Sequence, residues 1–75
     1  MEKEKIKSAI EAILFAAGRE VKEEELILSL EIGKEELENI IREMQKEREK
    51  SGIEIIKIKD SYQMCSKKEY YEYIY

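Results

Sequence analysis

The stretch EELENIIREMQKEREKSGIEIIKIKDSYQMC, residues 35–65, decides the fold of this chain. Its first half repeats apolar residues at intervals of three and four, which is the period of an amphipathic helix. Its second half is dense in β-branched isoleucine and is interrupted by a short polar turn at 59–61, which indicates two strands. The stretch therefore predicts a helix over 35–50, followed by a hairpin of strands 53–59 and 62–65.

Two further helices precede this stretch. Apolar residues at helical spacing predict the first over 3–17, and Gly18 follows it as a left-handed stop. The second, over 23–30, opens with three glutamates, whose charge complements a helix N-terminus. Gly33 lies in the link to the third helix and suits a helix-turn-helix. We expect these stripes to face the core: Ile6, Ile10, Ile13 and Ala17; Leu26, Ile27 and Leu30; Leu37, Ile40, Ile41 and Met44.

The remaining segments complete a familiar order of elements. Residues 19–21 are long enough only for a link or a strand with one pair, and residues 67–75 predict the start of a fourth helix. Three helices followed by a two-stranded hairpin is the order of a winged helix-turn-helix, a mainly helical α+β fold. With 75 residues and no proline, repeat or low-complexity linker, the chain is expected to form a single domain over 1–75.

The composition limits the classes of function. The chain has a net charge of −4, all of it in residues 1–50, and an acidic domain repels nucleic-acid phosphates unless its bases are concentrated on one face. No apolar run approaches the roughly 20 residues that span a bilayer. The N-terminal residues 1–5 have mixed charge and lack the apolar core of a signal peptide. These features predict a cytoplasmic protein.

Residues that carry enzyme chemistry are scarce. There is no histidine, and Cys65 is the only cysteine, so an intrachain disulfide and the usual zinc ligand sets are excluded. Cys65 falls in a predicted strand, where a small buried hydrophobic role is usual. The three glycines are isolated and form no phosphate-binding loop. We therefore expect no catalytic residue, cofactor or metal site.

The first predicted helix also carries a family resemblance. The phrase IEAILFAAG, residues 10–18, resembles the opening helix of the segregation and condensation protein B family, in which a similar phrase reads IEALLFA-G. Further features of that family follow in order: Val21, Glu23-Glu24-Glu25-Leu26, Gly52-Ile53-Glu54-Ile55, Tyr62 and Glu69-Tyr70. Two positions depart from the usual pattern, because Lys22 and Lys34 stand where Ser or Thr would cap the second and third helices.

The resemblance implies a structural role in chromosome condensation and segregation. Members of the family dimerise through their first winged-helix domain and carry a second winged-helix domain after it. The second domain contacts the kleisin subunit, segregation and condensation protein A, which closes the ring of the SMC ATPase. The resemblance thus implies that residues 1–75 are the N-terminal half of a longer architecture, a homodimerising module that is cytoplasmic and nucleoid-associated.

Phe15 is the first candidate for a protein interface. At 100° per residue it lies about 180° from Ile6, so the two cannot face the same core. Ala12 and Ala16 share its side of the helix and make that side small and smooth. Either the hairpin or the last helix covers this face, or it contacts a second copy or another partner. Leu28 also falls off its helical stripe, as an ordinary surface leucine or as a partner contact.

Tyrosines supply further interface candidates. Five of them occupy the last fourteen residues: Tyr62, Tyr70, Tyr71, Tyr73 and Tyr75. Tyr70, Tyr73 and Ile74 share one side of the predicted last helix. Some of these rings must pack against the hairpin, whereas Tyr71 and Tyr75 are candidates for an exposed aromatic interface.

DNA binding is the alternative function for this fold. The third helix would then read bases, but residues 34–50 carry five basic and six acidic residues, and their first turn reads Lys-Glu-Glu. Glu38 and Arg42 are expected to form a surface pair instead. The remaining case for contact with the DNA backbone is a patch of Lys57, Lys59, Lys67 and Lys68. Such a patch would favour a winged-helix transcription regulator, and a third alternative is an adaptor in another protein assembly.

Overall fold

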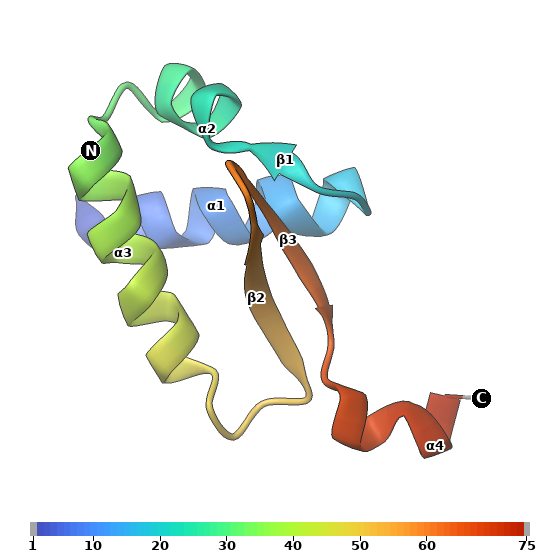
Figure 1. Ribbon diagram of the computed structural model, residues 1–75. Helices are drawn as coiled ribbons and strands as arrows, with labels where there is room; N and C mark the ends of the chain where they lie inside the picture. The colour runs from blue at the N-terminus through green and yellow to red at the C-terminus, as the bar shows by residue number, and fades with distance from the viewer. Residues whose placement is uncertain (1, 75) are drawn as a thin grey trace.

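The computed structural model describes residues 2–74, and its elements follow the predicted order. They are α1 (Lys3–Ala17), β1 (Val21–Lys22), α2 (Glu23–Leu30), α3 (Lys34–Glu47), β2 (Ile53–Ile58), β3 (Ser61–Ser66), the 3-10 turn η1 (Lys68–Tyr70) and α4 (Tyr71–Ile74). Figure 1 shows α1 lying across the hairpin of β2 and β3, while η1 and α4 project from the foot of the hairpin. This arrangement leaves α4 apart from the three longer helices.

The helix ends are set by local backbone geometry. Gly18 ends α1 in the left-handed region, with φ 61°, and its N–H donates to the carbonyl of Leu14. Glu31 ends α2 in the same region, with φ 54°. Lys22 precedes α2 without a side-chain cap, as predicted, but the residue before α3 is Gly33, so Lys34 is the first residue of α3 and not its cap.

α3 ends at Glu47, three residues before the predicted end at residue 50. Just beyond this end, the backbone contacts a side chain from much later in the chain. Lys67 Nζ donates to the carbonyl oxygens of Arg48 and Glu49, at 2.8 Å and 2.6 Å. These carbonyls are therefore satisfied outside the helix, and Arg48 has left the helical region with φ −102°.

The sheet has a third strand where the sequence allowed either a link or a strand with one pair. The hairpin of β2 and β3 is confirmed, but β1 adds to the other edge of β3, so that the strand order is β1-β3-β2. Val21 pairs with Tyr62 and Lys22 with Ser61, all antiparallel. Val21 is buried in the core, which brings its backbone against β3 and allows two pairs to form. Lys59, with φ 56°, falls in the turn and ends β2 one residue earlier than predicted.

The core lies between the helices and the inner face of the sheet. Its buried apolar residues are Ile6, Ile10, Leu14, Val21, Leu26, Leu30, Leu37, Ile40, Ile41, Met44, Ile55 and Tyr62. The α3 stripe is confirmed in full. In α1 the buried row is Ile6, Ile10 and Leu14, whereas Ile13 and Ala17 are only half-buried, because the sheet crosses α1 along an i, i+4 row. Ile27 in α2 is likewise half-buried.

Candidate protein-binding surface

The outward face of α1 is uncovered. Phe15 is 74% exposed, and Ser8, Ala12 and Ala16 beside it are also exposed. The first alternative for this face, cover by the hairpin or by the last helix, is therefore wrong. The hairpin packs on the side of α1 that carries Ile10, and α4 projects away from α1 (Figure 1).

Phe15 borders a hollow between the end of α1 and the foot of the hairpin, which we name the Phe15 groove. Its volume is about 240 Å³. It is lined by Leu14, Phe15, Gly18, Ile53, Met64, Cys65 and Ser66, none of which carries a charged side chain at neutral pH. Ligand pockets are typically ~300–1,000 Å³, so the groove is suited to one or two side chains rather than to a cofactor.

Two residues of this groove were missed in the sequence. Ile53 was expected only as a strand residue, yet it is 40% exposed at the rim of the groove. Met64 lies opposite Ile55 in the sheet and is half-buried. Cys65 is also half-buried rather than buried, and desolvation, together with the charge of Glu54, raises the pKa of its thiol. Only the pairing of β2 with β3 against α1 brings these side chains to Phe15, and no local signal reveals it.

Leu28 lies on a different surface. It is 71% exposed on α2, and Glu24, Glu25 and Glu31 around it in sequence are exposed as well. Residues 23–36 carry six glutamates and one lysine, a net charge of −5, whereas the rest of the chain carries 13 basic and 12 acidic residues. The helix-turn-helix corner is thus the acidic part of the molecule.

The tyrosines divide between the core and the projecting end. Tyr62 is 2% exposed, and burial raises the pKa of its hydroxyl. Tyr71 is 38% exposed, while Tyr75 lies outside the residues that the structure describes. The most exposed large side chains of α4 are Tyr73 and Ile74, at 79% and 54%, which were not among the predicted interface residues. They were assigned to one side of a longer helix, but a helix of four residues beyond the hairpin has no core to face.

The four lysines proposed for DNA lie at opposite ends of the hairpin: Lys57 and Lys59 near the turn, Lys67 and Lys68 at the foot. β3 separates the two pairs by roughly 17 Å. Lys57 Nζ lies 3.5 Å from a carboxylate oxygen of Glu38 and 5.8 Å from the centre of the Tyr62 ring. Lys67 is engaged with the carbonyls at the end of α3. The structure does not gather these lysines into one basic patch.

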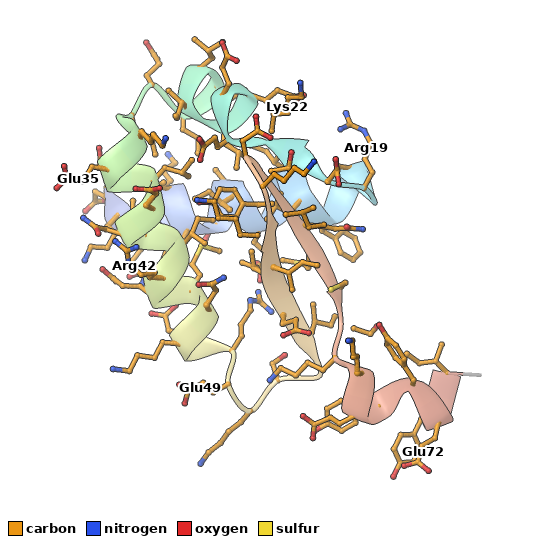
Figure 2. All side chains as sticks on the ribbon, in the orientation of Figure 1. Arg19, Lys22, Glu35, Arg42, Glu49 and Glu72 are labelled. Atoms are coloured by element: carbon orange, nitrogen blue, oxygen red, sulfur yellow. The ribbon has the colours of Figure 1, made fainter. Side chains whose placement is uncertain are left out.

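The outer side of α3 is also unsuited to phosphates. Glu35 and Glu36 are exposed in its first turn, and Figure 2 shows Glu35 near the start of the helix, Arg42 further along it and Glu49 just beyond its end. The predicted pair of Glu38 with Arg42 is wrong. Arg42 donates to Asn39 Oδ1 at 2.6 Å, and Glu38 turns to the hairpin lysine.

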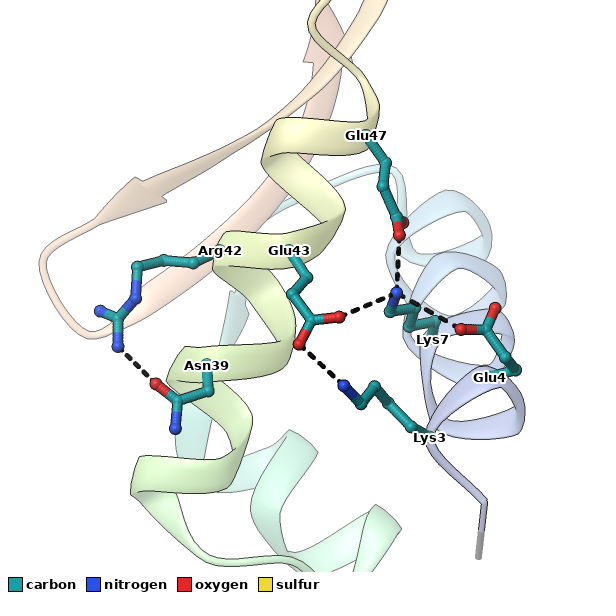
Figure 3. Close-up of polar contacts among 7 residues, drawn as sticks. All are labelled: Lys3, Glu4, Lys7, Asn39, Arg42, Glu43 and Glu47. Atoms are coloured by element: carbon teal, nitrogen blue, oxygen red, sulfur yellow. Dashed lines mark hydrogen bonds and ion pairs between the residues drawn. The ribbon is translucent and has the colours of Figure 1, made fainter.

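A cluster of charges joins α1 to α3 (Figure 3). Lys7 is buried, and its Nζ lies 2.7 Å from Glu47, 3.1 Å from Glu43 and 3.4 Å from Glu4. The hydrogen bond to Glu47 is the main cause of a raised pKa at Lys7. Lys3 Nζ lies 3.0 Å from Glu43. The hydrogen bond from Lys3 is the main cause of a lowered pKa at Glu43, and the hydrogen bond from Lys7 is the second.

One turn further along α1, Glu11 pairs with Arg48 at the end of α3. Lys3, Lys7 and Glu11 are spaced by four residues, so they form one row that faces α3. Phe15 follows at the same spacing, just beyond the last ion pair. The cluster therefore fixes the orientation of the helix that presents Phe15. The spacing of four residues between these charged side chains is visible in the sequence, but it does not reveal that their partners lie on α3.

The family profile of "Segregation and condensation complex subunit ScpB" matches residues 8–75. The chain belongs to this family. Relatives include segregation and condensation protein B of Alkaliphilus oremlandii, 45% identical over 76 residues that cover 99% of this chain and 41% of the relative. That of Clostridioides difficile is 40% identical over 79 residues, which cover 99% and 44%. The chain thus spans about two fifths of the length of these curated relatives.

A solved structure of the same family has the same fold. It is the crystal structure of a dimer of the ScpB N-terminal domain complexed with ScpA peptide, with a TM-score of 0.83 and 28% sequence identity. The match covers 91% of this chain and 88% of that one. The predicted family and the predicted winged-helix fold are both confirmed.

Two features are absent from residues 2–74. No helix there is long and apolar enough to cross a membrane. In that same part of the chain, no group of three or more His, Cys, Asp or Glu side chains is placed to hold a metal ion.

Proposed function

We propose that this chain is a non-enzymatic subunit of the SMC–kleisin complex that condenses and segregates bacterial chromosomes, and that this domain joins two copies of the protein. The observation that carries the proposal is the uncovered Phe15 face beside an uncharged groove. Membership of the ScpB family and the dimeric state of the related N-terminal domain support it.

The chemistry of the α1 face favours a second copy of the chain. Ala12 and Ala16 have small side chains, which let two helices approach closely, and Phe15 offers a large apolar surface to bury. A two-fold interface needs a patch that complements itself. The Phe15 face meets that need because it is apolar and carries no excess of one charge.

The second proposed partner is the kleisin subunit, segregation and condensation protein A, and through it the SMC ATPase. A peptide of ScpA occupies the related dimer. Leu28 and Tyr71 are exposed away from the Phe15 face and are candidates for this contact, together with Tyr75. The role needs no catalytic residue or cofactor, and it places the protein in the cytoplasm at the nucleoid.

A transcription regulator that binds duplex DNA is the disfavoured alternative. Its recognition helix would approach the duplex with Glu35 and Glu36 first, and its four candidate lysines lie at two ends of the hairpin. Phosphate contacts dominate the affinity of such proteins and need clustered bases. Residues 23–36, with a net charge of −5, would instead repel the DNA backbone.

Two measurements test the proposal together. Sedimentation velocity of the 75-residue chain, from low micromolar to high micromolar concentration, is expected to show a monomer–dimer equilibrium. Fluorescence anisotropy of a labelled random duplex, at about 50 mM and about 200 mM salt, is expected to show no binding at micromolar protein. A chain that stays monomeric would refute the joining role. DNA binding that weakens steeply with salt would favour the alternative and direct mutagenesis to the hairpin lysines.

A further inference from the structure

We infer that the two copies exchange C-terminal arms, so that Tyr73 and Ile74 of each copy enter the Phe15 groove of the other. The C-terminal arm is defined here as residues 67–74, which comprise η1, α4 and the residue before them. The inference rests on the proposed self-association and adds how the two copies bind each other.

The arm exposes apolar side chains that its own domain leaves uncovered. Tyr73 is 79% exposed and Ile74 is 54% exposed, although only Lys67 and η1 separate α4 from β3 (Figure 1). The rings of Tyr70 and Tyr73 lie 6.4 Å apart and tilted by 39°, a geometry that holds the two rings together on one segment. Large apolar side chains grouped on one projecting segment mark a contact site rather than scattered surface residues.

The groove offers a matching receptor in the same molecule. Phe15 and Ile53 stand at its rim with 74% and 40% of their surface exposed, so the arm of the same copy does not fill it. Its volume of about 240 Å³ suits one or two side chains of the size of Tyr73 and Ile74. Ser66 and Cys65 are among the lining residues, and side chains of these types can form hydrogen bonds with a tyrosine hydroxyl.

Symmetry and charge identify the occupant as a second copy of this chain. A closed two-fold dimer buries the same patch twice, and each copy here carries both a projecting arm and an uncharged groove. Residues 67–74 have two lysines and two glutamates, so each arm meets the uncharged groove of the other copy without net repulsion. The helix-turn-helix corner, at −5, would repel its equivalent in a second copy. The dimeric state of the related N-terminal domain agrees with this occupant.

Cys65 makes the inference directly testable, because this single cysteine lines the groove. The variants Tyr73→Cys and Ile74→Cys each add a second thiol to the chain and place it on the arm. After oxidation with diamide, we expect a covalent dimer on a non-reducing gel, with position 73 or 74 of one copy bonded to Cys65 of the other in a tryptic mass map. A mixture of Tyr73→Cys/Cys65→Ser with the native chain should give the same bond between different copies.

Matched controls separate exchange from random collision. Glu72→Cys places a thiol on the neighbouring position of the arm and should form far less covalent dimer (Figure 2). Without oxidation, Tyr73→Ala should weaken the dimer by roughly tenfold or more, whereas Glu72→Ala should leave it nearly unchanged. These affinity measurements need no disulfide, so they remain valid even if a cysteine at position 73 disturbs the contact.

Each outcome decides something. A native chain that dimerises in sedimentation, but gives no bond from position 73 or 74 to Cys65 and keeps its affinity in Tyr73→Ala, overturns arm exchange and leaves the proposed function standing. A bond formed within one copy shows that the arm folds back on its own groove and also overturns it. A native chain that stays monomeric refutes the proposed function, and the exchange falls with it.

Discussion

Replacing Phe15 by glutamate should separate the two copies without unfolding either. The side chain is 74% exposed in the single copy, so its loss removes little from the core. Exposed substitutions of this kind usually change stability by less than about 0.5 kcal/mol. Glu11, one turn earlier on α1, adds a like-charge repulsion of a few tenths of a kcal/mol. The helical content of Phe15→Glu should therefore equal that of the native chain.

The effect on association is much larger. A phenylalanine buries on the order of 150–250 Å², and three quarters of that area remain available here. At ~25 cal/mol per Å², complete burial in the interface would contribute about 3–5 kcal/mol per copy, as an upper bound. Two-fold symmetry doubles the number of rings lost, and the new carboxylate must also be desolvated. We expect the dimer constant to weaken at least about a hundredfold, which corresponds to ~2.7 kcal/mol.

Sedimentation equilibrium measures this constant, with circular dichroism to check the fold. Leu28→Glu is the matched control, because Leu28 is equally exposed at 71% and lies on α2, away from the Phe15 groove. It should dimerise as the native chain does. A Phe15→Glu chain with native affinity would remove Phe15 from the interface, and equal losses in both variants would show that added negative charge alone, not the lost ring, drives the effect.

Three further predictions concern the fold and its ionisable groups. Ile10→Ala, at a fully buried position, should lower the free energy of unfolding by about 2–5 kcal/mol in urea titrations, and a loss below ~1 kcal/mol would contradict the core position. Because the pKa of Glu43 is lowered in the folded chain, its ionised carboxylate stabilises the fold at neutral pH, and this stability is lost as the pH falls below the usual carboxyl range. Because the pKa of Lys7 is raised, the stability contributed by its charge persists up to alkaline pH. The melting temperature should therefore fall between pH 7 and about pH 3, and fall less in Lys7→Met; an equal fall would show that the cluster is not responsible. Because burial and then Glu54 raise the pKa of Cys65, its alkylation at about pH 8 should be slower in the folded chain than in urea, and equal rates would refute the shielding.

The helices could be predicted because their signals are local. The spacing of Ile6 and Ile10 gave α1 with both of its ends, and Gly18 marked where it stops. The end of α3 could not be predicted in the same way. The carbonyls of Arg48 and Glu49, just beyond that end, accept hydrogen bonds from Lys67, which lies about twenty residues later. Likewise β1 pairs only because Val21 is buried, which is a tertiary effect.

The candidate site was half predictable for the same reason. The helical angle alone separated Phe15 from the core, and the exposure of Phe15 in the structure agrees with it. The opposite wall of the groove needed the pairing of β2 with β3 and their packing on α1, so Ile53 and Met64 escaped notice. The lysine patch was a different error. The predicted hairpin already placed Lys57 and Lys67 at opposite ends. The common patch was suggested only because these residues are all lysines.

The distribution of charge explains how this fold serves a purpose other than reading DNA. In a DNA-binding helix-turn-helix, the second helix enters the major groove with its N-terminal residues. Here that corner, residues 23–36, has a net charge of −5, while the other 61 residues carry +1. The surface that would meet phosphates is therefore the one least able to approach them. What remains for recognition is the uncharged Phe15 groove, between the end of α1 and the foot of the hairpin, and the arm that projects from that foot (Figure 1). Reversing the charge of Glu35 and Glu36 to lysine should for this reason raise affinity for duplex DNA in the anisotropy titration and leave the dimer constant unchanged, because the two surfaces share no residue.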